Sequence, residues 1–161
     1  GVSSAASDVY KRQVLKMTSI SKFWRDFCVE HQVSPTALEG AFAFGANSRD
    51  ADILSDLVKS GIKTATTSLY SAQEDVPVVG MYAIVLNGRN EPVCVIQNKT
   101  VEIMPFKNVS AEHAYLEGEG DRSYESWRKV HEKFFARECQ ELGREFTDET
   151  EVVCETFEKI I

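Results

Sequence analysis

A β-hairpin pattern in the middle of the chain sets the strongest limit on its fold. Two runs rich in β-branched and apolar residues, 78–86 and 92–103, flank the pair Asn87-Gly88. An Asn-Gly pair between two such runs is a strong short-range signal for a tight hairpin turn. The sequence therefore predicts two antiparallel strands at this point of the chain.

Patterns typical of helices lie on both sides of this hairpin. Each combines apolar residues at helical spacing with a polar residue that can cap the first turn or a glycine that can end the last. Four helices are predicted in this way: one after Met17 with Ser19 or Ser21 as its N-cap, one from Ser48 to Gly61, one from Ser110 to Leu116, and one from Asp121 or Ser123 to Gly143.

Further extended segments are expected at 41–45, 63–69 and 152–160. Because strands and helices do not alternate regularly along the chain, the pattern indicates an α+β fold rather than a doubly wound parallel sheet.

The overall composition is typical of one globular domain. The chain has 161 residues, of which 43% are hydrophobic, and this length is enough to bury a core. Residues 1–16 differ from the rest, so we expect a non-native or disordered leader there and a single domain over 17–161. No apolar run approaches the roughly 18 residues of a membrane helix, and a cytoplasmic location without a membrane partner is the expectation.

The charge and the cysteines restrict the classes of ligand. A net charge of −7 weighs against a protein that binds nucleic acid by neutralising many phosphates. A nucleoside-sized ligand needs no large basic face and stays compatible with this charge. The four cysteines form no CxxC pair, and no Cys or His pair has the spacing of zinc ligands. We therefore expect reduced, buried thiols and neither a metal nor another cofactor.

The segment from Gly61 to Ser68 places Lys63 three residues before Thr66 in a run rich in hydroxyl groups. A threonine hydroxyl is a weak nucleophile until a neighbour removes its proton or stabilises its negative charge, and a lysine can do either. Side chains three apart on a straight strand point to opposite faces, so this pairing needs a bend near Lys63. The simpler interpretation is a β-branched strand that follows a surface lysine.

Carboxylates and glycines alternate in the segment Glu117-Gly118-Glu119-Gly120-Asp121. The calcium-binding pattern of an EF-hand is absent, so a solvated acidic loop is the ordinary interpretation. In the functional alternative, one carboxylate keeps Lys63 charged and oriented or passes a proton to a leaving amine. The two segments together contain the groups that a metal-free amide-cleaving enzyme needs.

The last predicted helix carries one histidine on its apolar face. His131 lies four residues after Trp127, and a histidine in such a position is more often a half-buried structural residue than a catalyst. Trp127 is expected in the core, although an indole at a pocket edge can also stack on a base. His31 and His113 lie in polar surroundings that indicate no role. The apolar face is predicted to contain Trp127, Val130, Phe134, Phe135 and Leu142.

Three motifs form one long pattern. They are Gly61-x-Lys63-Thr64-Ala65-Thr66, the acidic segment followed by Ser123, Trp127, Arg128, His131, Phe134 and Phe135, and the closing segment Val152-Val153-Cys154-Glu155-x-Phe157. This pattern resembles the ASCH (activating signal cointegrator homology) domain from about Phe44 to Ile160. The resemblance implies a PUA-like fold, a small mixed β-barrel flanked by helices with a cleft between them.

The resemblance also implies a function. Members of this superfamily bind RNA or modified bases, and a bacterial branch hydrolyses N4-acetylcytidine and related N4-acylcytosines with a Lys, a Thr three residues later and a Glu. Carried onto this sequence, these residues are Lys63, Thr66 and Glu117, the last of which closes a His113-Ala114-x-x-Glu117 stretch. The present chain is longer than that branch and adds the acidic segment, so its substrate stays open.

The residues and the resemblance together predict a metal-independent amidohydrolase. Thr66 attacks the exocyclic amide carbonyl, Lys63 activates the hydroxyl, and Glu117 orients Lys63 and helps to protonate the leaving amine. Backbone N–H groups near Thr67 or Ser68 are expected to bind the oxyanion. Whether Glu117 or Glu119 faces Lys63 stays open, and the further candidates for substrate contacts are Thr67, Ser68, Tyr70, Glu119, Trp127, Arg128 and His131.

Two other functions stay open on the sequence. In a ribonuclease, Lys63 and His131 would be the acid–base pair, and in a non-catalytic binder of RNA or a modified nucleoside, Thr66 would only form a hydrogen bond with the ligand. A strongly salt-dependent RNA affinity would favour these two functions. The expected partner is a small nucleoside or nucleobase; RNA is disfavoured by the net charge, and the oligomeric state stays open.

Overall fold

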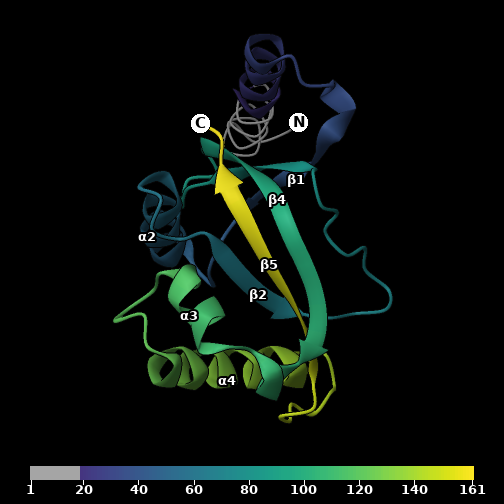
Figure 1. Ribbon diagram of the computed structural model, residues 1–161, viewed down its shortest axis with the longest axis vertical. Coiled ribbons are helices and arrows are strands. Elements are labelled where there is room, and N and C mark those ends of the chain that lie inside the picture. Colours follow the sequence, from purple (N-terminus) through teal and green to yellow (C-terminus); the bar gives the residue numbers. More distant parts are fainter. Residues whose placement is uncertain (1–18) are drawn as a thin grey trace, which may run out of the picture.

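A five-stranded mixed sheet forms the centre of the protein (Figure 1). The structure is a computed structural model and describes residues 19–161. The strands are β1 (Leu38–Ala43), β2 (Ala65–Leu69), β3 (Tyr82–Leu86), β4 (Pro92–Pro105) and β5 (Glu151–Lys159). Their order is β1-β3-β4-β5-β2, with β1 and β3 parallel and the other neighbours antiparallel. The predicted α+β class is confirmed.

The sheet is open, which corrects the expected small barrel. β1 and β2 are its two edges, and within the described residues no ladder joins them. Closure into a barrel would require these two edge strands to pair with each other. The long strands β4 and β5 form the central ladder, and α2 (Ser48–Lys59) packs against β3, β4 and β5 while α3 (Ala111–Glu117) lies beside β2 (Figure 1).

The hairpin of β3 and β4 is confirmed, but its turn differs from the predicted Asn-Gly turn. The N–H of Asn90 donates to the carbonyl of Asn87 at 3.0 Å, and the positive φ of 59° falls on Asn90. Gly88 is instead required by close packing, because a Cβ atom there would lie 2.1 Å from the carbonyl oxygen of Ser48. The glycine therefore allows the turn to approach the neighbouring helix.

Four α-helical segments accompany the sheet in the described chain. They comprise residues 19–31, α2 (Ser48–Lys59), α3 (Ala111–Glu117) and α4 (Tyr124–Glu141); short 3-10 turns are η1 (Pro35–Ala37) and η2 (Phe106–Asn108). Ser110 caps α3, which runs one residue past the predicted end, and Ser123 caps α4, as predicted. The predicted N-cap Ser48 is wrong by one residue, because the side chain of Asn47 accepts the N–H of Asp50.

The first helix also begins earlier than predicted. Ser21 lies inside it and Ser19 is already helical, so neither is its N-cap. Met17 and the expected leader over residues 1–16 lie outside the described residues. No helix within residues 19–161 is long and apolar enough to cross a membrane.

Three apolar clusters attach the helices to the sheet. Residues 19–31 pack through Trp24 and Phe27 on β3 and β4, α2 packs through Val58, and α4 packs through Trp127 and Phe135 on β5. The predicted apolar face of α4 is partly wrong: Cys139 is buried there, whereas three predicted members, Val130, Phe134 and Leu142, are 58%, 42% and 60% exposed. All four cysteines are free and buried, as predicted.

Candidate active site

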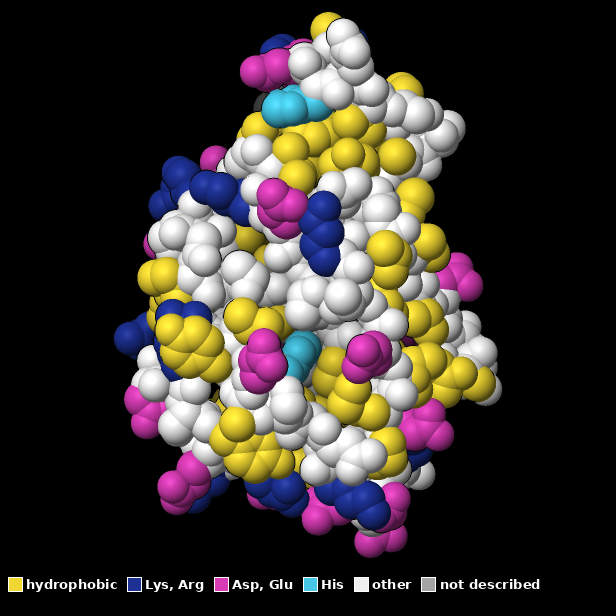
Figure 2. Space-filling model, in the orientation of Figure 1, with side chains coloured by type: hydrophobic (Ala, Val, Ile, Leu, Met, Phe, Trp, Pro, Cys, Tyr) yellow, Lys and Arg dark blue, Asp and Glu magenta, His cyan; other side chains and the backbone are white. Residues whose placement is uncertain are grey.

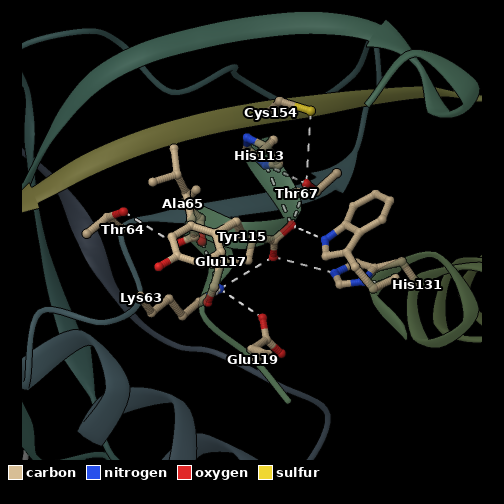
Figure 3. A network of polar contacts seen from close by, with 12 residues as sticks. Lys63, Thr64, Ala65, Thr67, His113, Tyr115, Glu117, Glu119, His131 and Cys154 are labelled. Carbon is tan, nitrogen blue, oxygen red and sulfur yellow. Dashed lines mark hydrogen bonds and ion pairs between the residues drawn. The ribbon is translucent and has the colours of Figure 1, made fainter. Parts of the chain in front are cut away.

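The ammonium group of Lys63 lies at the centre of the site, and the residue is only 2% exposed. Its Nζ atom donates to the carbonyl oxygen of Ala65 at 2.8 Å, to Oε1 of Glu117 at 3.4 Å and to Oε2 of Glu119 at 3.0 Å (Figure 3). The carbonyl oxygen of Glu117 is a fourth acceptor, at 3.5 Å. The three protons of the ammonium group therefore all have acceptors. The interpretation of Lys63 as a surface lysine is therefore wrong.

Two helix ends position Lys63. Gly61 has a φ of +80° and lies just past the end of α2, the conformation in which glycine commonly ends a helix. The N–H of Lys63 then donates to the carbonyl of Leu57 in α2 at 3.0 Å, and the N–H of Thr64 donates to that of Leu116 in α3 at 2.8 Å. The chain between α2 and β2 is thus fixed against both helices before the strand begins.

Glu117 is a buried carboxylate surrounded by donors, and it is 1% exposed. Oε2 accepts from Thr67 Oγ1 at 2.8 Å and, in a short bond, from Trp127 Nε1. Oε1 faces Lys63 Nζ at 3.4 Å and His131 Nε2 at 3.5 Å. Burial alone would raise the pKa of Glu117, but the bonds and charges of His131, Lys63 and Trp127 outweigh it and lower this pKa to about 2. Glu117 is therefore a stable anion.

His131 completes one side of this anion. Its Nδ1 atom lies 2.8 Å from the carbonyl oxygen of Trp127, and its ring stacks on the indole of Trp127. Burial lowers the pKa of His131, but the hydrogen bond and charge of Glu117 outweigh burial and leave the pKa raised. Because both ring nitrogens face acceptors, His131 supports the charge of Glu117.

His113 is the residue that the sequence reasoning missed. Its Nε2 atom lies 2.9 Å from Thr67 Oγ1, and burial lowers its pKa against the opposing charge of Glu117. Since Thr67 gives its one proton to Glu117, we assign the proton on Nε2 of His113 as the donor to Thr67. The four-residue spacing of His113 and Glu117 on one helix was the signal that could have placed His113 beside Glu117, and the two side chains lie 3.6 Å apart.

A cavity of about 410 Å³ opens beside this network. Its rim is apolar, since Ile53, Val130 and Phe134 line it and are 50%, 58% and 42% exposed. The volume falls in the range of small-molecule sites, about 300–1,000 Å³. Of the predicted site residues, those that line this cavity are Lys63, Thr66, Thr67, Glu117, Glu119, Trp127 and His131.

Thr66 and Thr67 reach the cavity in different settings. They alternate along β2, where Thr67 is buried and Thr66 is half-buried. The hydroxyl of Thr67 is engaged by Glu117 and His113, whereas the described contacts include no hydrogen bond between Lys63 and Thr66. Lys63 and Thr66 therefore share the wall of the cavity without a hydrogen bond between them.

Three predicted substrate contacts lie away from the cavity. Ser68 and Tyr70 follow on β2 and beyond it without lining the cavity, and Ser68 is exposed. Arg128 follows Trp127 on α4 and is therefore turned to another side of the helix. Its guanidinium group pairs with Asp148 at 2.6 Å and lies over the ring of Phe106.

The site also contains a potential set of metal ligands. Oxygen and nitrogen atoms of Glu117, Glu119 and His131 lie within 4.8 Å of one another. The ammonium group of Lys63 already contacts both carboxylates, at 3.4 and 3.0 Å. A metal ion would have to displace the ammonium group of Lys63 from both carboxylates. These oxygen and nitrogen atoms therefore suit an ion pair with Lys63 better than a metal ion.

Comparison with known proteins identifies the family. The model of the ASCH domain family matches residues 40–161.

The chain belongs to the ASCH domain family.

Solved structures agree with this assignment. The ASCH domain from Lactobacillus crispatus JV V101 is 32% identical, with a TM-score of 0.79 over 89% of this chain and 92% of that one. Protein EF3133 from Enterococcus faecalis V583 is also 32% identical, with a TM-score of 0.80 over 89% and 94% of the two chains. The hypothetical protein PH0355, 20% identical with a TM-score of 0.51 over 76% and 98%, shares the fold alone. No curated protein matches this ASCH domain.

Proposed function

We propose that this ASCH domain is an amidohydrolase that removes acyl groups from the exocyclic amine of N4-acylated cytidine or cytosine. One observation carries the proposal: a small cavity places a threonine, Thr66, on the same wall as a buried ammonium group, Lys63, that two carboxylates surround. A hydroxyl nucleophile beside a fixed positive charge suits acyl transfer, because negative charge develops on the amide oxygen in the transition state.

Each residue has a distinct role in this proposal. Thr66 attacks the amide carbonyl, since the hydroxyl of its neighbour Thr67 is committed to Glu117. Lys63 stabilises the developing negative charge rather than removing a proton, because all three of its protons already have acceptors. Glu117 holds the ammonium group in place.

The cavity favours a small ligand without phosphates. Three carboxylates, from Asp50, Glu117 and Glu119, line it together with Lys63 and His131, so a phosphate would meet more negative than positive charge. On the face seen in Figure 2, Lys and Arg side chains are scattered among Asp and Glu rather than gathered in one area. Both features support a nucleoside or nucleobase over RNA. A ribonuclease is further disfavoured because Glu117 and the carbonyl of Trp127 engage the ring of His131.

The test is the loss of the ultraviolet band of N4-acetylcytidine and the appearance of cytidine, with wild-type protein beside Thr66→Ala. We expect turnover by the wild type and a loss of about 10³-fold or more in the variant, as when a nucleophile is removed. Ser68→Ala is the matched control, because Ser68 lies on the same strand but is exposed and outside the cavity. No turnover of any N4-acylcytidine, with measurable binding of the nucleoside, would instead favour a non-catalytic binder.

A further inference from the structure

We propose that Glu119, and not Glu117, is the catalytic acid–base of this site, the group that carries the proton of Thr66 to the leaving amine. This assignment rests on the proposed function and names a further catalytic residue for it. It concerns the acidic segment that follows α3 rather than the buried carboxylate at the end of that helix.

The proposed reaction requires one group that accepts and then donates a proton. When Thr66 Oγ1 forms a bond to the acyl carbon, its proton must leave, and when the C–N bond breaks, the cytosine N4 atom must gain one. In the second half, water gives a proton to the same group as it attacks the ester, and Thr66 takes that proton back as the acyl group departs as a carboxylate. The released carboxylic proton goes to solvent, so the steps balance as hydrolysis.

Glu117 is unsuited to this task. Its side chain is 1% exposed, and donors from four residues, Lys63, Thr67, Trp127 and His131, face its two oxygens. A proton on Glu117 would have to replace one of these donors inside the protein. His131, Lys63 and Trp127 lower the pKa of Glu117 to about 2, which makes it a weak base near neutral pH.

The other titratable groups in the cavity have partners of their own. All three protons of Lys63 have acceptors. His131 presents both nitrogens to acceptors, the carbonyl of Trp127 and the carboxylate of Glu117. Asp50 lines the cavity from α2, and its carboxylate accepts from the side chain of Asn47 at the N-terminus of that helix.

Glu119 has the access that Glu117 lacks. Its side chain is 31% exposed and lines the cavity, and its Oε2 atom lies 3.0 Å from Lys63 Nζ. Among the described residues, Lys63 is the one hydrogen-bond or ion-pair partner of this carboxylate. Glu119 can therefore turn its second oxygen to the substrate while Lys63 retains the first.

Two glycines bring Glu119 to this position. Gly118 and Gly120 have φ values of +73° and +59°, which other residues adopt only with strain. A Cβ atom on Gly118 would lie 2.7 Å from the carbonyl oxygen of Ile62, so only glycine lets the acidic segment pack against the residue before Lys63. The alternation of carboxylate and glycine thus has a structural reason at the site.

Glu119 lies among several charged groups of the cavity. Its Oε2 atom lies 3.0 Å from Lys63 Nζ, and the carboxylates of Asp50 and Glu117 line the same cavity. On the α4 side, the charge of Glu119 is one of the causes that raise the pKa of His131.

The test compares Glu119→Gln with wild type on two substrates, N4-acetylcytidine and p-nitrophenyl acetate, counting only the activity that Thr66→Ala loses. We expect Glu119→Gln to lower kcat on the amide by about 10²–10⁴-fold, the usual contribution of general acid–base catalysis, with little change in KM. On the ester, the burst of p-nitrophenol reports acylation before the shared acetyl-enzyme is hydrolysed, and its rate should fall at least about tenfold less, because p-nitrophenolate leaves without a proton. Glu125→Gln, a change at an exposed position of α4 outside the cavity, is the matched control.

The outcomes separate the two proposals. An active wild type with a Glu119→Gln variant within about threefold of it on the amide would overturn the role of Glu119 and leave the proposed function standing. Equal losses in amide turnover and in the rate of the ester burst would overturn its role as the acid for the leaving amine. A wild type that hydrolyses neither substrate would overturn the proposed function and the role of Glu119 with it.

Discussion

Replacing Lys63 by methionine removes the cation from a buried ion pair and tests how the site is built. The side chains of Lys63 and Glu117 are each 1% exposed, and their charged atoms lie 3.4 Å apart. Removing one partner of such a pair costs about 3–5 kcal/mol, because an uncompensated charge stays in the interior. For a domain of this size that cost corresponds to a fall of about 6–20 °C in the thermal midpoint.

The assay is thermal and guanidinium unfolding at pH 7, with Lys99→Met as the matched control. Lys99 pairs with Glu158 at 3.1 Å, a similar distance, but these side chains are 46% and 61% exposed, so its loss should cost at most about 1 kcal/mol. Adding Glu117→Gln to Lys63→Met should recover part of the stability, because the unpaired charge is then gone. Equal midpoints for the two methionine variants would refute the reasoning that Lys63 is a buried, paired charge.

Three further predictions concern stability. Burial and the charge of Glu39 raise the pKa of Glu155 to about 7 against the opposing charge of Lys63. The fold therefore favours the protonated form of Glu155, and stability falls as pH rises between about 4.5 and 7. Glu155→Gln should stabilise the protein by up to about 3 kcal/mol at pH 8 and by nothing at pH 4, and equal changes at both pH values would contradict this. Gly118→Ala should lower the free energy of unfolding in urea by about 2 kcal/mol or more. The matched control Gly143→Ala should lower it by about 1 kcal/mol, because Gly143 has a similar φ of +69° but open space around its Cβ position. Equal losses would refute the close contact between Gly118 and Ile62. Ser123→Ala should lower the thermal midpoint by about 2–4 °C, since its side chain caps α4 by accepting the N–H of Ser126 at 3.1 Å, and an unchanged midpoint would refute that cap.

Features set by a few neighbouring residues could be predicted from the sequence. The caps Ser110 and Ser123, the helix end at Gly61 and the hairpin of β3 and β4 depend on local backbone geometry, and each is found. The exact turn of the hairpin could not be predicted, because Gly88 is fixed by a contact with Ser48 far away in the sequence.

Features that depend on long-range packing could not be read from local patterns. The burial of Lys63 results from α2 and α3 ending at the same place, and no spacing within 61–68 reveals that. Likewise, Val130 and Phe134 fit the apolar face of α4 but line an open cavity instead. Both Glu117 and Glu119 face Lys63. Glu117 ends α3, and Glu119 follows Gly118, whose left-handed backbone conformation turns the chain back towards Lys63.

The open sheet has the same kind of explanation. The family resemblance carried an expectation of a closed barrel, but closure depends on whether the edges β1 and β2 meet, which involves strands from distant parts of the chain. The resemblance did indicate Lys63 and Glu117, and the structure places these two residues together.

The central claim, acyl transfer through Thr66, is tested most directly by intact-mass and peptide-mapping spectrometry of protein quenched in acid during turnover of N4-acetylcytidine. The account predicts one added acetyl group on the peptide that contains Thr66, located on that residue by fragmentation and absent from the Thr66→Ala variant. Acetylation of Thr67 or Lys63 instead, or turnover that persists in Thr66→Ala, would contradict it.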